Sequence, residues 1–160
     1  IVLGGFSKYF CMTGWRLGWI VAPEALIKDI EILAQNAYVS PPALAQYAAL
    51  AAFDTQTFDE LESRRNQFKA RRDYLVGALR QIGFEIAKPP AGAFYIYADA
   101  SRFTDDSFAF AFRLLNEAGV ACAPGKDFGQ FRANHYLRFA FTRSVDQLSA
   151  GISRLKSFLS

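Results

Sequence analysis

The residues most able to do chemistry lie near the start of the chain, in the segment GFSKYFCMTGWRLG at positions 5–18. Lys8 is followed six residues later by Gly14 and eight residues later by Arg16. A lysine amine can form an imine with an aldehyde, and a planar guanidinium pairs well with phosphate or carboxylate. Taken singly, such side chains are most often solvated, so the hypothesis of a reactive site rests on their combined spacing.

A second candidate arginine, Arg138, lies in the segment HYLRFAF at positions 135–141. Apolar and polar residues alternate here, which predicts a strand over residues 136–142 with Leu137, Phe139 and Phe141 on its buried face. Arg138 then lies on the polar face of what we interpret as an edge strand. Such an arginine is often only solvated, but the preceding turn PGKDFG at 124–129 strengthens the functional interpretation.

The lysine segment, the PGKDFG turn and the Arg138 strand resemble motifs of the class I/II aminotransferases, which have fold type I and depend on pyridoxal 5'-phosphate (PLP). The resemblance covers essentially the whole chain. It implies that Lys8 holds the cofactor as a Schiff base and moves a proton during catalysis. It also implies that Arg16 pairs with the cofactor phosphate, that Ser7 is a further cofactor contact, and that Arg138 binds the substrate α-carboxylate.

The same segment carries glycines whose role follows from the resemblance, and two departures from the family pattern. Gly14 and Gly18 are expected to let the backbone turn tightly beside the reactive residues. Gly5 stands where many members carry a phosphate-binding serine, and Cys11 stands where a small residue without a thiol is usual.

The implied activity is transfer of an amino group between an L-amino acid and a 2-oxo acid by a homodimer without metal, nucleic-acid or membrane partners. Two alternatives remain open, namely a PLP-dependent lyase or synthase of the same fold, and a non-catalytic aminotransferase-like regulatory domain. Family members also have a long N-terminal portion that supplies the partner of the pyridinium nitrogen. We therefore expect this chain to be a C-terminal portion that is inactive by itself.

Composition agrees with a protein of the cytoplasm. The 18 basic and 15 acidic residues leave a formal charge of +3 and are spread along the chain, so they do not argue for nucleic-acid binding. The two cysteines, Cys11 and Cys122, are far apart and are expected to be reduced thiols. No apolar run approaches the ~20 residues that a bilayer span needs.

Hydrophobic periodicity predicts an α/β fold. In the first half we expect a strand at 1–3 that is buried on both faces, a strand at 15–21, a helix from 23 with Leu26, Ile30 and Leu33 on one face, and a helix at 43–53. A long helix should begin at Thr57, which has capping-box spacing to Glu60, and end before Gly83.

In the second half we expect strands at 84–87, 93–97 and 120–123, and a helix with Phe108, Phe112 and Leu115 on one side that ends at Gly119. A final helix should follow the capping-box pair Ser144 and Gln147. The expected organisation is the end of a large PLP-binding domain at 1–56, an interdomain helix at 57–83 and a small α/β domain at 84–160.

Overall fold

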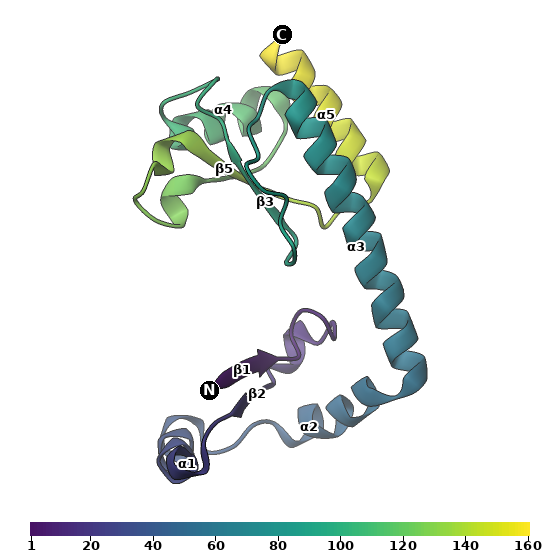
Figure 1. Ribbon diagram of the computed structural model, residues 1–160, viewed down its shortest axis with the longest axis vertical. Helices are drawn as coiled ribbons and strands as arrows, with labels where there is room; N and C mark the ends of the chain where they lie inside the picture. The colour runs from purple at the N-terminus through teal and green to yellow at the C-terminus, as the bar shows by residue number, and fades with distance from the viewer. The chain divides into compact units, whose positions relative to one another are not determined.

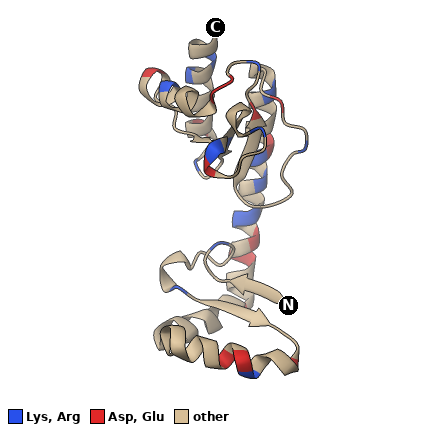
Figure 2. Cartoon of the chain, turned by 90° about the vertical axis from the view of Figure 1, so that its left-hand side faces the viewer, with Lys and Arg blue, Asp and Glu red and all other residues tan.

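The computed structural model describes residues 1–160 and divides into two compact units, Ile1–Arg65 and Asn66–Ser160 (Figure 1). The boundary falls inside helix α3 (Thr55–Ile82), whose 28 residues run without a break. Along α3 most acidic residues lie near its start and basic residues predominate after Arg64, whereas strands β1 and β2 carry no charge (Figure 2). No helix combines the length and the apolar character needed to cross a membrane.

The first unit contains a short antiparallel pair of strands followed by helices. Strand β1 (Val2–Gly5) pairs with β2 (Gly18–Val21), and α1 (Glu24–Tyr38), α2 (Ala43–Leu50) and a 3-10 turn (Ala51–Phe53) follow. Helix α2 and the 3-10 turn together confirm the helical segment predicted at 43–53. A small core forms between the loop that joins the strands and α2, from Phe6, Met12, Ala49 and Ala52.

The burial expected for the strands and for α1 is wrong in this chain. Ile1 and Leu3 are 74% and 77% exposed, because β1 and β2 pair only with each other and no third strand or covering helix joins them. Helix α1 forms as its periodicity predicts but buries none of its residues, and Leu33 is 69% exposed. Periodicity therefore predicted the conformation of these segments but not what covers them.

Two boundaries in this unit also differ from prediction. Residues Thr13–Trp15 form a 3-10 turn, so β2 begins at Gly18 and not at Trp15. Helix α3 begins two residues before Thr57, because Asp54 has an extended backbone and its carbonyl accepts the Phe58 N–H at 3.0 Å. Thr57 thus lies inside the helix and does not cap it.

The second unit is a three-stranded antiparallel sheet covered on one face by helices (Figure 1). Its strands β3 (Tyr95–Asp99), β4 (Ala123–Pro124) and β5 (Tyr136–Ala140) lie in the order β3-β5-β4. The C-terminal half of α3 packs on the inner face of the sheet with α4 (Ser107–Ala118) and α5 (Val145–Leu159). The inner face of the sheet consists of Ile96, Ala98, Leu137 and Phe139.

Several expectations for this unit are confirmed. Leu137, Phe139 and Phe141 are buried as their alternation predicts. Ser144 and Gln147 form the predicted capping box at the start of α5. Gly119 ends α4 in the left-handed conformation, which glycine adopts without steric cost.

The strands of the second unit differ from prediction in position and length. Strand β5 is central, with β3 and β4 on its two sides, and is not an edge strand. The segment at 84–87 forms only one bridge, between Glu85 and Asp99. The strand predicted at 93–97 begins at Tyr95, and the one predicted at 120–123 is reduced to the two residues of β4.

The face that α4 buries also differs from prediction. Its buried residues are Ser107, Phe110, Ala111 and Leu114, while Phe108, Phe112 and Leu115 are about half exposed. Both sets recur at helical spacing, because the helix carries apolar residues around most of its circumference. Contacts with the sheet and α5 therefore determine which face of α4 is buried, and the spacing of its apolar residues does not determine it.

Candidate functional site

The loop that carries Lys8 connects β1 to β2 and is held from beneath by aromatic packing. The Phe6 and Phe10 ring centroids are 4.9 Å apart, and those of Phe6 and Phe53 are 6.0 Å apart in an edge-on arrangement. Met12 is buried in the same cluster. Because Phe6, Phe10 and Met12 point into this small core, Lys8 between them is exposed.

Hydrogen bonds within the loop close it on itself. The Phe6 N–H donates to the Leu17 carbonyl, and the Met12 N–H donates to the Phe6 carbonyl, both at 3.1 Å. The Thr13 hydroxyl donates to the Ser7 carbonyl at 2.6 Å. These bonds close residues 6–17 into a single loop, which contains Ser7, Lys8 and Arg16.

Arg16 has a left-handed backbone, with φ 52° and ψ 47°, and its guanidinium donates to the Thr13 carbonyl at 3.2 Å. Cys11, with φ 57°, is the other left-handed residue of the loop. The expectation that Gly14 provides the tight turn is thus wrong, since its φ is not positive and its side-chain position is open. Gly18 serves a different purpose, because a Cβ there would lie 3.0 Å from the Gly4 carbonyl oxygen.

The residue after the lysine links the loop to the start of α3. The Tyr9 hydroxyl donates to Glu62 at 2.8 Å, and Arg65 forms an ion pair with the same carboxylate at 2.7 Å. The hydrogen bond to Glu62 raises the pKa of Tyr9, and the hydrogen bond from Arg65 lowers the pKa of Glu62. Both shifts favour a neutral phenol that donates to an ionised carboxylate.

In the second unit, Arg138 lies on the outer face of the sheet, half-buried, opposite Tyr97 and Ala123 in the register. Its guanidinium carbon lies 4.0 Å from the Tyr95 ring centroid and 4.0 Å from the Phe128 ring centroid. None of the ion pairs or side-chain hydrogen bonds of the structure involves Arg138. Its N–H groups are therefore available to an acceptor that is not part of this chain.

A row of aromatic rings continues from Arg138 across the sheet. The Phe128 ring meets Tyr97 edge-on with centroids 6.3 Å apart, and Tyr97 stacks on Tyr136 at 4.6 Å with nearly parallel planes. Tyr136 in turn lies under the guanidinium of Arg132, 5.7 Å from the ring centroid. A cavity of about 360 Å³ opens beside this row, lined by Tyr97, Phe128, Gly129, Gln130 and Phe131.

Burial and charge affect the ionisable groups at the far end of this row. Burial raises the pKa of Tyr97, so its hydroxyl remains protonated over the physiological range. Burial by itself would also raise the pKa of Asp99, but hydrogen bonds from Ser101 and the charge of Arg132 bring this pKa below its usual value. The Arg132–Asp99 ion pair, at 3.0 Å, joins the loop before β5 to the end of β3.

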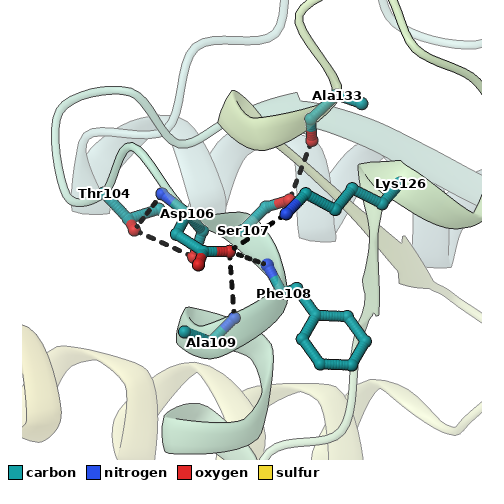
Figure 3. A network of polar contacts seen from close by, with 7 residues as sticks. All are labelled: Thr104, Asp106, Ser107, Phe108, Ala109, Lys126 and Ala133. Atoms are coloured by element: carbon teal, nitrogen blue, oxygen red, sulfur yellow. Dashed lines mark hydrogen bonds and ion pairs between the residues drawn. The ribbon is translucent and has the colours of Figure 1, made fainter.

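The turn that presents Phe128 is anchored at both ends to the start of α4 (Figure 3). The Asp106 carboxylate accepts the N–H groups of Phe108 and Ala109 at 3.1 and 3.3 Å and lies 3.7 Å from the Lys126 amine. The buried Ser107 hydroxyl donates to the Ala133 carbonyl at 2.8 Å. Residues 126–133 are thereby fixed between two contacts with one helix end.

The predicted site residues fall into two groups. Ser7, Lys8 and Arg16 share one closed loop of the first unit, and Arg138 lies in the second unit. Sequence reasoning missed Tyr95 and Phe128 as neighbours of Arg138. A signal for Tyr95 existed, because strand alternation places it on the same face as Arg138 once β3 and β5 are paired. The structure has no cluster of three or more His, Cys, Asp or Glu residues that could hold a metal ion.

Comparison with known proteins agrees with these features. A family model described as aminotransferase class I and II matches residues 1–155. Valine–pyruvate aminotransferase of Mycobacterium tuberculosis is 40% identical over 159 residues, which are 99% of this chain and 41% of that protein. A Methanocaldococcus jannaschii protein named (5-formylfuran-3-yl)methyl phosphate transaminase is 36% identical over 99% of this chain and 42% of its own length.

The fold is shared as well. The crystal structure of an aminotransferase from Mycobacterium tuberculosis superposes with a TM-score of 0.95 at 40% identity, over 99% of this chain and 41% of that one. The chain thus spans about two fifths of the length of the relatives that it matches and has their α/β fold over that part. It belongs to the class I and II aminotransferases, a family whose members depend on PLP.

Proposed function

We propose that this chain provides the lysine and both arginines of an aminotransferase that moves an amino group between an L-amino acid and a 2-oxo acid. The observation that carries the proposal is the closed loop of residues 6–17, in which Lys8 and Arg16 are both exposed while Phe6 and Met12 are buried in a small core. Its match to the family and the availability of the Arg138 N–H groups support the same conclusion.

The residues of the loop fit PLP by their chemistry. Lys8 has an exposed amine that suits an aldehyde, and Arg16 has a guanidinium that suits a phosphate dianion. Ser7 is partly exposed on the same turn and adds a hydroxyl. When bound, the cofactor would supply a carbonyl that takes up the amino group and a ring that accepts electrons.

Each residue of the chain would then have a defined task. The Lys8 amine would hold the cofactor and could take the proton from the substrate α-carbon. The Arg16 guanidinium binds the phosphate, and the Arg138 guanidinium binds the α-carboxylate through two parallel N–H groups. Lysine could not replace either arginine fully, because an ammonium is a point charge without the planar fork.

We also propose that the protein works as a homodimer in the cytoplasm, and that the segment at 57–83, most of which lies in α3, links domains at 1–56 and 84–160. Two unpaired cysteines are compatible with a reducing compartment. Sedimentation of the purified protein would measure its oligomeric state.

The first test is borohydride reduction of the 160-residue chain mixed with PLP, followed by peptide mapping. We expect the stable adduct to form at Lys8 in preference to Lys28, Lys69, Lys88, Lys126 and Lys156, which serve as internal controls. A Lys8→Arg variant should lose that adduct and keep the background at the other lysines. Equal labelling of all lysines by the parent chain would contradict the assignment of Lys8.

The second test measures the reaction. In a chimera, this chain would replace the matched 41% of the Mycobacterium tuberculosis valine–pyruvate aminotransferase. We expect amino transfer that Lys8→Arg abolishes, while Arg138→Lys raises the KM for the amino acid by about 10-fold or more, since a charged hydrogen bond contributes about 1.5–3 kcal/mol. A folded chimera that binds PLP but gives ammonia in place of an amino-acid product would indicate a lyase.

A further inference from the structure

Two aromatic rings contact the Arg138 guanidinium, and no ion pair or side-chain hydrogen bond within the chain holds it. Tyr95 and Phe128 each place a ring centroid 4.0 Å from the guanidinium carbon. The two rings pair with other partners, Tyr95 with Phe94 and Phe128 with Tyr97, and not with each other. The guanidinium therefore lies between them.

This placement has a consequence for binding. A guanidinium is planar, and all its N–H groups point outward in that plane. Rings stacked on its two faces therefore leave the N–H groups at its edge free to form hydrogen bonds. A carboxylate binds at that edge with two parallel hydrogen bonds. Fixing the plane before binding reduces the side-chain entropy that is lost when the carboxylate arrives.

Both rings are themselves fixed by the fold. Tyr95 is the first residue of β3 and is paired with Ala140 of the central strand. Phe128 follows the 3-10 turn Gly125–Asp127, and its N–H donates to the Gly125 carbonyl at 2.9 Å. The Asp106–Lys126 contact (Figure 3) and the edge-on contact between Phe128 and Tyr97 hold the same turn.

We propose that Tyr95 and Phe128 are positioning residues that clamp the Arg138 guanidinium in the plane required for bidentate binding of a substrate carboxylate. The inference rests on the proposed function of Arg138 and adds the residues that prepare it. Specificity for a carboxylate over a spherical anion such as chloride would follow from the fixed plane, because only a planar acceptor matches two parallel N–H groups.

The experiment is an NMR titration of the guanidinium of Arg138 in the 160-residue chain with acetate as the probe. In the parent, ring currents from the two rings should shift the Arg138 N–H protons upfield, and acetate should shift them downfield as they form hydrogen bonds to its carboxylate. Phe128→Leu and Tyr95→Leu should each remove part of the ring-current shift and weaken acetate binding by about 2- to 10-fold, the effect expected when binding must itself immobilise one long side chain.

Matched variants separate positioning from a general effect on structure. Tyr95→Phe keeps the ring and should bind acetate like the parent. Phe131→Leu changes a ring that lines the neighbouring cavity, is 88% exposed and does not contact Arg138, so it should also have no effect. The pairing of β3 with β5, followed by cross-strand nuclear Overhauser effects, should be unchanged in all of them.

The outcomes distinguish this inference from the function on which it rests. If the leucine variants bind acetate as tightly as the parent, the clamp is refuted while the role of Arg138 stands. If the parent itself shows no response of Arg138 to acetate, both the carboxylate-binding role and the clamp are refuted, whereas the Lys8 adduct remains a separate test of the cofactor site.

Discussion

Replacement of Leu114 by alanine should strongly destabilise the second unit, while the same change at Leu115 should not. Leu114 is completely buried between the sheet and α5, whereas Leu115 is 47% exposed. The pair is well matched, because the residues are adjacent, chemically identical and part of the same helix.

The magnitudes follow from burial. Shortening a buried leucine to alanine removes about three carbon groups at ~0.8 kcal/mol each and leaves a cavity, so the total loss is about 2.7–5 kcal/mol. Leu115 is about half exposed in the folded chain, so its burial contributes only about half of the transfer free energy, and its removal leaves no closed cavity. We therefore expect Leu115→Ala to lower the free energy of unfolding by about 1 kcal/mol or less.

Native-state hydrogen exchange is the suitable assay, because both tryptophans, Trp15 and Trp19, lie in the first unit and their fluorescence would not report on the second. The amides of Leu137 and Phe139 in the central strand should exchange about 100-fold faster or more in Leu114→Ala, since each 1.4 kcal/mol is a factor of ten. They should change less than about 10-fold in Leu115→Ala. Equal effects, or a larger one at Leu115, would show that α4 buries the other face.

Three further predictions concern the turn, the thiols and the buried carboxylate. Gly125→Ala should destabilise the second unit by about 1–3 kcal/mol in the same exchange assay, because its Cβ would collide with the Ala133 carbonyl oxygen and lie 2.7 Å from the Tyr97 hydroxyl; an unchanged rate would mean that the turn can move. Burial raises the pKa of Cys122 to about 12, so a thiol reagent at pH 8 should label exposed Cys11 alone until denaturant is added, and rapid labelling of both thiols would contradict that burial. The lowered pKa of Asp99 means that its ionised carboxylate, held by hydrogen bonds from Ser101 and by the charge of Arg132, contributes stability above about pH 4 that is lost as the pH falls further; Asp99→Asn should therefore flatten the acid limb of a stability–pH curve, and a parallel curve would exclude this contribution.

The parts of the fold that could be predicted from sequence are those determined locally. Ser144 and Gln147 predict the start of α5, and Gly119 predicts the end of α4, because a cap or a left-handed residue acts through its own backbone. Alternation likewise predicts which residues of β5 face inward. The residues of the lysine loop were identified by a motif, which depends on spacing and not on tertiary contacts.

The parts that failed depend on partners distant in the sequence. The apolar residues Phe108 and Phe110 of α4 are equally suited to burial, and only the sheet decides that Phe110 is covered. Arg138 was placed on an edge strand because strand order cannot be deduced from a single strand. Its contact with Phe128 was missed for the same reason, since it depends on how the turn at 124–129 folds back over the sheet.

The central position of β5 determines where the gene can tolerate insertions and deletions. Because β5 is hydrogen-bonded on both sides, one residue added or removed within it would send Phe139 to the solvent and turn Arg138 into the core. The connection before it, around Gly129–Phe131, is exposed and could absorb a change of length. Related genes should therefore differ in length at this connection and keep the spacing within the strand, which makes this connection the natural place to insert a reporter peptide.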